Sequence, residues 1–132
     1  MSCSTTRATS SRAAFLVAQG FGRRRIAAGG GGAIVNIASI TGISAPATIT
    51  PYSVSKAALI QLTRNLAREW AQFGIRTNAI APGYFESNLN RGFLKTEAGQ
   101  RMIRMHPMRR IGRTDELSGA LLLLASDAGS YI

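Results

Sequence analysis

A tyrosine and a lysine stand four residues apart, at Tyr52 and Lys56, in the stretch PYSVSKAALIQL. Residues with this spacing share one face of an α-helix. A free phenol has a pKa of about 10, so it is a poor proton acceptor at neutral pH. A neighbouring ammonium favours the phenolate, and the positive end of a helix adds a smaller effect in the same direction. A tyrosine in such a setting can give a proton to a carbonyl oxygen or take one from an alcohol.

The pair alone also fits a solvated lysine beside a core tyrosine, so the residues before it matter. Ser39 ends the stretch AIVNIAS, whose apolar, β-branched residues 33–38 predict a buried parallel strand. Ligands of open parallel sheets bind beyond the carboxyl ends of the strands. A serine hydroxyl at that place could hold a substrate oxygen against the phenol. The alternative is a strand-end serine that bonds its own turn.

Helices and strands alternate along the rest of the chain. Thr50 and Pro51 are typical of a helix cap and first helical position, and Thr114 is typical of a second cap. We expect the last helix to bury Leu117, Ala120, Leu121 and Leu124. The predicted order is helix 13–28, strand 33–38, helix 51–72, strand 76–81, an irregular lid over 84–113, and the last helix.

This alternation predicts an α/β fold with a parallel sheet and helices on its faces. Two strands alone would leave unpaired edges and apolar faces in water. We therefore expect a partial doubly wound sheet that lacks strands before residue 13 and after residue 132. The predicted division is an unmatched, disordered start over 1–12 and one partial domain over 13–132.

Composition narrows the class of protein. A chain of 132 residues with 45% hydrophobic and 17% charged residues is that of one globular domain. No apolar run approaches the roughly 20 residues that span a bilayer, so no membrane partner is expected. Cys3 is the only cysteine, which excludes an internal disulfide and fits a reducing compartment. One cysteine and one histidine, His106, cannot form a zinc site, so no metal is expected.

The net charge of +10 raises the alternative of nucleic-acid binding. The arginines are scattered, however, and no aromatic residues alternate with them to stack bases. We therefore expect no nucleic-acid partner. The Ser/Thr/Arg-rich residues 1–12 also suggest a targeting segment, but they lack an apolar helix face.

Three stretches in order resemble the short-chain dehydrogenase/reductase family. GGAIVNIAS, PYSVSKAALIQLTRNLAREWA and GIRTNAIAPG are similar to the family's fifth strand, active-site helix and sixth strand. The resemblance implies the catalytic half of a Rossmann-like domain and an NAD(P)-dependent enzyme that interconverts a carbonyl and an alcohol. It implies that Tyr52 is the acid/base and that Ser39 orients the substrate oxygen. Lys56 would favour the phenolate and, with Tyr52, contact the nicotinamide ribose.

The same resemblance implies a cofactor-binding segment after the second strand. The Pro82–Gly83 turn would lie along the nicotinamide, with the Phe85 backbone and the Ser87 hydroxyl near its carboxamide or phosphates. The family usually has threonine where this chain has Ser87, and both carry a hydroxyl.

The sequence departs from the family in the cofactor platform. Ser10 stands where the family has an asparagine that orders a water. The glycine-rich dinucleotide motif requires glycines after a strand and before a helix. Gly20 and Gly22 lack the preceding strand, and glycines 29–32 follow a helix instead. The cofactor is therefore predicted as NAD or NADP without a choice between them.

Two functional interpretations follow. The first is a cytoplasmic oxidoreductase acting on a small-molecule carbonyl or alcohol as a homodimer or homotetramer, with this chain by itself an inactive fragment. The second is a non-catalytic fragment that self-associates through helices 13–28 and 51–72. The lid, YFESNLNRGFLKTEAGQRMIRMHPM, resembles those of 3-oxoacyl-carrier-protein reductase-like members and sugar-acid dehydrogenases. Its arginines either meet an acidic substrate or face water.

Overall fold

The structure is a computed structural model that describes residues 5–88 and 90–132, with side chains from residue 11 onward. The chain forms two compact units. The first contains residues up to Pro82 together with Ala120–Ile132, and the second is Gly83–Gly119, which we call the lid unit.

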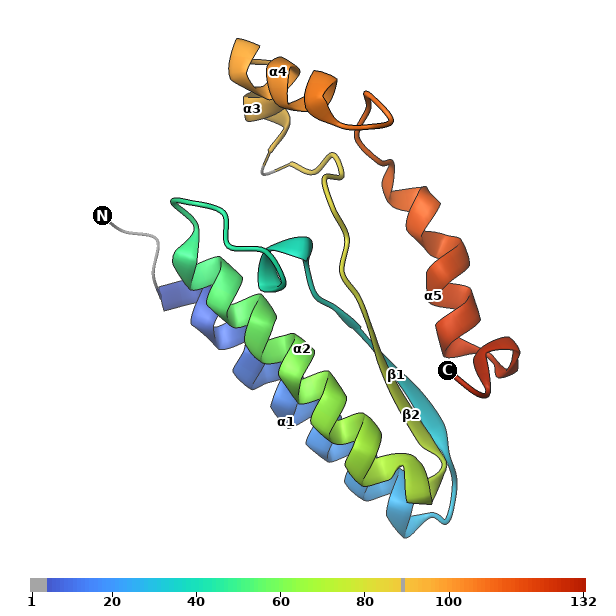
Figure 1. Cartoon of the computed structure of the whole chain (residues 1–132). Helices are drawn as coiled ribbons and strands as arrows, with labels where there is room; N and C mark the ends of the chain where they lie inside the picture. The colour runs from blue at the N-terminus through green and yellow to red at the C-terminus, as the bar shows by residue number, and fades with distance from the viewer. Residues whose placement is uncertain (1–4, 89) are drawn as a thin grey trace. The chain divides into compact units, whose positions relative to one another are not determined.

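The first unit is built on two parallel strands, β1 (Gly32–Ile37) and β2 (Ile75–Ile80). Their register pairs Gly32 with Ile75 and Ile37 with Ile80. Helices α1 (Thr5–Ala27) and α2 (Thr50–Trp70) lie side by side, and α2 connects the two strands (Figure 1). The prediction of an α/β fold with a partial parallel sheet is confirmed.

Glycines end the helices and let the elements approach closely. Gly74 takes φ +68° at the turn after α2, a left-handed conformation that glycine adopts without steric cost. A side chain on Gly31 would place its Cβ 2.5 Å from the Gly74 carbonyl oxygen, so the turns that precede β1 and β2 touch through their backbones. On α1, Gly22 accommodates the indole ring of Trp70.

The core lies between α2 and the strands. Ile75 at the start of β2 is fully buried, with Leu59 and Leu66 of α2 and Ala18 of α1 nearly so. A polar pair also lies there: Asn36 Nδ2 of β1, which is half-buried, donates to Thr63 Oγ1 at 2.9 Å, and Thr63 Oγ1, which is buried, donates to the Leu59 carbonyl at 2.8 Å. This bond favours the observed position of β1 along α2, because a shift by one residue would separate the two side chains.

Several predicted helix starts differ from the structure. Helix α1 begins at Thr5, eight residues before the predicted start at residue 13 and within the range 1–12 that we predicted to be an unmatched, disordered start; residues 1–4 lie outside the described part. The prediction of Thr50 as a cap is wrong, because Thr50 is itself helical and Ile49 holds the cap position without a side-chain bond. Proline at the second helical position supplies the fixed φ that starts the helix.

The prediction for the last helix is also corrected. A 3₁₀ turn over Thr114–Leu117 precedes α5 (Ser118–Ala125), and Arg113, not Thr114, is the cap residue. No residue of α5 is buried, and Leu121 is 43% exposed. Of the four residues expected on a buried side, Leu117 and Leu124 are half-buried, while Ala120 and Leu121 are exposed. Helical periodicity identifies the apolar face of a helix. It does not show whether another part of the protein packs against that face.

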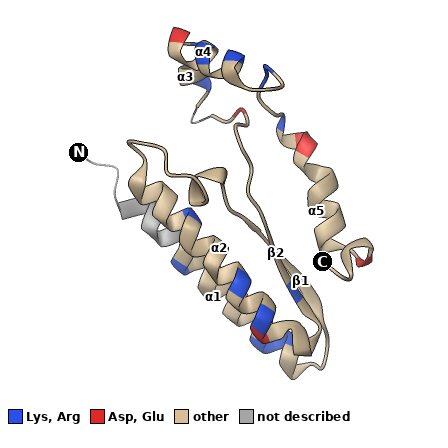
Figure 2. Cartoon of the chain, viewed as in Figure 1, with Lys and Arg blue, Asp and Glu red and all other residues tan. Residues whose placement is uncertain are grey.

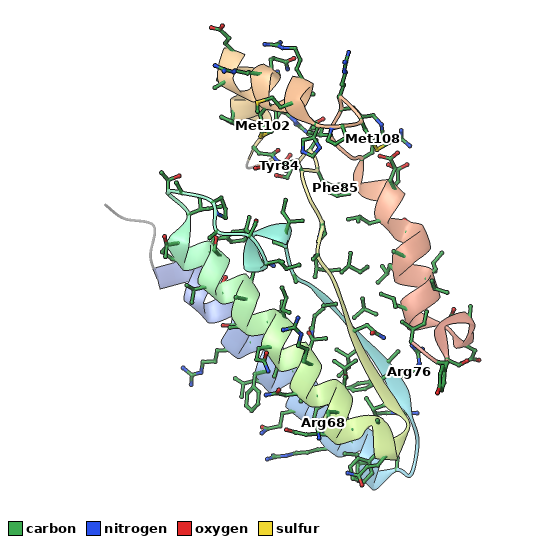
Figure 3. All side chains as sticks on the ribbon, in the orientation of Figure 1. Arg68, Arg76, Tyr84, Phe85, Met102 and Met108 are labelled. Carbon is green, nitrogen blue, oxygen red and sulfur yellow. The ribbon has the colours of Figure 1, made fainter. Side chains whose placement is uncertain are left out.

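The C-terminal segment is attached to β2 by side chains. Arg76 donates from Nη1 to the Leu124 carbonyl at 2.9 Å and from Nη2 to the Ser126 carbonyl at 3.0 Å (Figure 3). Asn78 Nδ2 donates to the Ile132 carbonyl at 2.9 Å. Residues 120–132 therefore belong with the strands, although the helix that leads to them starts in the lid unit.

The lid unit contains the short helices α3 (Arg91–Leu94) and α4 (Glu97–Met105). Thr96 caps α4 by accepting a bond from the Gly99 amide at 3.2 Å. Figure 2 shows basic residues distributed along α1, α2, β2 and the lid unit instead of gathered on one element.

Candidate active site

The carboxyl end of β1 is tied to the first turns of α2. Lys56 Nζ donates to the carbonyl of Ile37, the last residue of β1, at 2.7 Å. Ser39 follows two residues later and is 7% exposed. The lysine predicted to serve the active site therefore lies at the strand end that carries the predicted serine.

Lys56 also lies beside the phenol of Tyr52. Its Nζ is 5.6 Å from the centroid of the Tyr52 ring, within the range of a cation–π contact. The two side chains lie close together because their four-residue spacing places them on one face of α2, as the sequence predicted. One ammonium thus contacts both the tyrosine and the end of β1.

Ser39 is held in an extended conformation (φ −166°, ψ 154°) as the cap of a 3₁₀ turn over Ile40–Gly42. Its Oγ accepts from the Thr41 amide at 3.2 Å and from Thr41 Oγ1 at 3.0 Å. The serine therefore does bond its own turn. Both contacts use the acceptor capacity of the hydroxyl, whose single hydrogen can still be directed toward a substrate oxygen.

The end of β2 meets the end of β1. The Ala38 amide donates to the Ile80 carbonyl at 2.7 Å, and the Ile40 amide donates to the Pro82 carbonyl at 3.1 Å. Pro82 is thus bonded to the residue that follows Ser39. The carboxyl ends of both parallel strands form one edge, the place where α/β sheets bind ligands.

The other predicted cofactor residues lie in or at the start of the lid unit. Gly83 begins that unit, and Phe85 and Ser87 follow it. The Asn90 side chain holds this segment by two hydrogen bonds, which the sequence analysis did not predict. Its Nδ2 donates to the Phe85 carbonyl at 2.7 Å, and its Oδ1 accepts from the Ser87 amide at 2.8 Å. The tendency of asparagine side chains to bond nearby backbone was the available signal.

A glycine allows the turn after Ser39 to touch α2. A Cβ on Gly42 would lie 2.7 Å from the Lys56 carbonyl carbon and 2.8 Å from the Ala57 nitrogen, both backbone atoms that cannot rotate away. This contact sets the distance between the serine turn and the helix that carries Tyr52 and Lys56.

We expect Gly42→Ala to lower the free energy of unfolding by about 1–3 kcal/mol, the usual cost of overpacking. Chemical denaturation of the 132-residue chain measures the loss. The control is Gly119→Ala in α5, where a Cβ meets nothing within 4 Å and alanine favours the helix. Equal stability of the two variants would contradict the close contact at Gly42.

Comparisons with known proteins show the family to which this chain belongs. A family model described as enoyl-(acyl carrier protein) reductase matches residues 2–132. The chain belongs to the short-chain dehydrogenase/reductase family. Its β1–α2–β2 arrangement is therefore part of a short-chain dehydrogenase fold.

Relatives within the short-chain dehydrogenase/reductase family include galactitol 2-dehydrogenase (L-tagatose-forming) of Cereibacter sphaeroides, 41% identical over 89% of this chain and 47% of the relative. Gluconate 5-dehydrogenase of Burkholderia cenocepacia, solved with NADP and tartrate, is 41% identical with a TM-score of 0.84, over 89% of this chain and 46% of that one. An NAD⁺-bound xylitol dehydrogenase has 32% identity and a TM-score of 0.80, over 90% of this chain and 51% of its own. The chain spans about half the length of the relatives it matches.

The lid of this short-chain dehydrogenase/reductase chain carries a shallow, open pocket of about 400 Å³. The residues around it are Ala98, Arg101, Met102, Met105, His106 and Pro107. His106 meets Tyr84 edge-to-face, with ring centroids 5.4 Å apart. His106 thus packs within the lid unit.

A second feature of the lid is a cluster of charges at its C-terminal end. Arg110 donates to both carboxylate oxygens of Glu116 at 2.8 Å, and the Arg113 amide donates to Glu116 Oε2 at 2.8 Å. The bond from Arg110 and then the backbone bond lower the pKa of Glu116 to about 2. A lowered pKa in the folded state means that this carboxylate stabilises the cap at pH values above its ordinary value of 4.5.

We expect the contribution of Glu116 to be lost as pH falls from about 4.5 toward 2. Carboxyl NMR titration measures this directly, and Arg110→Gln should move the pKa of Glu116 back toward its ordinary value. The control is Arg104→Gln, which changes an arginine outside the cluster. An unaltered titration of Glu116 in Arg110→Gln would contradict the assignment.

Among the described residues, no helix is long and apolar enough to cross a membrane. No group of three or more His, Cys, Asp or Glu residues in the described part of the chain could hold a metal ion.

Proposed function

We propose that this chain supplies the proton-transfer residues of an NAD(P)-dependent short-chain dehydrogenase that interconverts a secondary alcohol and a ketone. One observation carries the proposal: the Lys56 ammonium lies beside the Tyr52 ring and bonds the end of the strand that leads to Ser39. A phenol, a hydroxyl and an ammonium at the carboxyl edge of parallel strands can bind an alcohol oxygen and transfer its proton.

Each of the three residues has its own role in the reaction. Ser39 donates a hydrogen bond to the substrate oxygen and orients it. Tyr52 takes the hydroxyl proton in alcohol oxidation and returns it to the carbonyl oxygen in reduction. Lys56 keeps positive charge beside the phenol while that proton moves. The nicotinamide cofactor, when bound, accepts or donates the hydride, because no side chain can carry one.

We assign the nicotinamide end of such a cofactor to residues of this chain. Lys56 and Tyr52 would contact the ribose, and the segment from Pro82 through Gly83 and Phe85 to Ser87 would line the nicotinamide. Asn90 supports this assignment, because it holds the Phe85 carbonyl and the Ser87 amide in fixed positions. The adenine and pyrophosphate would be held by a cofactor-binding half outside this chain.

Solved relatives bind NADP or NAD⁺, which supports either cofactor without selecting one. Relatives named for galactitol and gluconate point to a polyol or a sugar acid as the substrate class. Arg101 in the wall of the lid pocket is compatible with an acid. A cytoplasmic location and a homodimer or homotetramer remain predictions.

A chimera tests the proposal: this chain replaces the segment that it matches in Burkholderia cenocepacia gluconate 5-dehydrogenase. We expect NAD(P)H formation with at least one of gluconate, galactitol and xylitol. The 132-residue chain alone should show neither turnover nor NAD(P)H binding. A folded chimera that binds NADP but oxidises no secondary alcohol in a broad panel would contradict the proposal.

A second candidate is self-association without catalysis. It is favoured by apolar side chains on the surface of the paired helices, above all Leu16 and Val17 of α1 and Val54 of α2. Val17 is 73% exposed. Analytical ultracentrifugation of the chain alone distinguishes the cases, because a monomer at tens of micromolar would exclude this role.

A further inference from the structure

Residues 84–87, which we call the cofactor-lining segment, are bonded to the C-terminal part of the lid unit. The Gly112 amide donates to the Tyr84 carbonyl at 2.9 Å, and the Glu86 amide makes a longer bond to the Gly112 carbonyl, at 3.4 Å. Together these bonds form a parallel bridge between Phe85 and Gly112. Figure 3 labels Tyr84 and Phe85 in this segment. The path of the cofactor-lining segment therefore depends on the position of Gly112.

The Phe85 ring also packs directly on the Gly112 backbone. A Cβ on Gly112 would lie 2.7 Å from Phe85 Cδ1 and 2.8 Å from Cζ, too close for two carbon atoms. Glycine is the residue that permits such an approach. Asn90 bonds the cofactor-lining segment locally, whereas Gly112 joins it to a part of the chain that is distant in sequence.

Glu116 holds the backbone on both sides of Gly112. Its carboxylate accepts two bonds from the Arg110 guanidinium and one from the Arg113 amide, all at 2.8 Å. Arg110 Nη1 also donates to the Ile111 carbonyl at 3.2 Å. One carboxylate thus joins the residue two positions before Gly112 to the residue directly after it. Paired bonds between a guanidinium and a carboxylate are strong and fix the orientation of both groups.

We propose that Glu116 is a positioning residue for the cofactor: by holding Gly112, it keeps the cofactor-lining segment in the shape that receives the nicotinamide. Glu116 acts through the Arg113 amide and Gly112 and does not touch the cofactor. All the residues that connect Glu116 to the segment belong to the lid unit. The inference rests on the proposed function for the role of the cofactor-lining segment.

The expected effect is on one end of the cofactor. Without the Glu116 carboxylate, Gly112 and the cofactor-lining segment are freer to move, and binding of the nicotinamide must order them again, which lowers affinity. We expect Glu116→Gln to weaken NADPH binding by about fivefold, the lower end of the usual coupling between two separate sites. A ligand without nicotinamide should bind as before, because its adenine and phosphates are held outside the lid unit.

Asp115→Asn is the matched control, because it removes the same charge from the neighbouring residue. Asp115 accepts two bonds from the Arg113 guanidinium, at 3.2 and 2.9 Å, instead of from the Arg113 amide. Its side chain is 67% exposed, whereas that of Glu116 is 30% exposed. The second test variant is Arg110→Gln, which removes the main partner of Glu116 and leaves the carboxylate in place.

Two measurements test the inference. Hydrogen exchange of the 132-residue chain reports on the Gly112 and Glu86 amides, which should exchange faster in Glu116→Gln than in Asp115→Asn. Calorimetry of the chimera with gluconate 5-dehydrogenase gives the Kd for NADPH and for phospho-ADP-ribose, which is the cofactor without nicotinamide. The relative that supplies the other half of the chimera was solved with NADP. Comparing the two ligands separates positioning of the nicotinamide from general destabilisation, which would weaken both.

Faster exchange together with a loss of NADPH affinity alone, in Glu116→Gln and in the same direction in Arg110→Gln, supports the inference. If Glu116→Gln does not fold, Arg110→Gln must show the same difference between the two ligands, and its absence overturns the inference. Unchanged exchange, equal weakening of both ligands, or an equal effect of Asp115→Asn would also overturn it.

The proposed function fails in a different way. If the unchanged chimera binds phospho-ADP-ribose as tightly as NADPH, the nicotinamide gains nothing from this chain, and the role of the cofactor-lining segment is wrong together with the inference. If the unchanged chimera prefers NADPH and Glu116→Gln keeps that preference in full, only the inference is wrong.

Discussion

Tyr52→Phe in the chimera with gluconate 5-dehydrogenase should lower kcat by about a thousandfold, within the range that general acid–base groups contribute. The change removes only the phenolic oxygen, so the ring beside Lys56 Nζ remains in place. Cofactor affinity should change little, and the loss should appear in kcat instead of in the Kd for NADP.

The control is Tyr84→Phe, which removes the same atom from a tyrosine that packs edge-to-face on His106 in the lid. Its kcat should stay within a few-fold of the unchanged chimera. If both variants lost turnover equally, the effect would come from disturbed packing. If Tyr52→Phe kept full turnover, Tyr52 would not be the acid/base.

Ile75→Ala should cost about 2–5 kcal/mol of unfolding free energy, as truncations of buried isoleucines do. Ile75 is the largest side chain that is fully buried in the described residues, at the start of β2 and under α2. Few other residues are buried as deeply, so the core has little capacity to compensate for a cavity there. Urea denaturation followed by circular dichroism measures the loss.

The matched control is Ile43→Ala, because Ile43 is 75% exposed in the turn after Ser39. Its cost should be within about 0.5 kcal/mol of zero, as for most surface substitutions. Similar losses for Ile43 and Ile75 would mean that the core does not lie between α2 and the strands.

Local patterns predicted the strands and the central helix well. The β-branched residues 33–38 and the periodicity of 51–72 identify β1 and α2 within one or two residues. Helix starts were less predictable, since Thr50 and Thr114 have the residue type of a cap but not its backbone geometry. The exposure of Leu121 was beyond prediction, because burial depends on which surface meets a helix and not on the helix alone.

In the candidate site, too, local features could be predicted from the sequence, whereas contacts between distant residues could not. Spacing on one helix predicted that Lys56 lies near Tyr52. The bond from Lys56 to Ile37 joins residues far apart in sequence, so it required the packing of α2 on β1. The support that Asn90 gives to Phe85 and Ser87 was local, yet it was missed because a resemblance draws attention to the residues of known motifs.

A crystal structure of the chimera with NADP and a substrate alcohol tests the central claim most directly. We predict that the alcohol oxygen lies within about 3 Å of both Ser39 Oγ and Tyr52 Oη, a hydrogen-bond distance, with Lys56 Nζ beside the nicotinamide ribose. An alcohol bound away from Ser39 and Tyr52 would contradict the account.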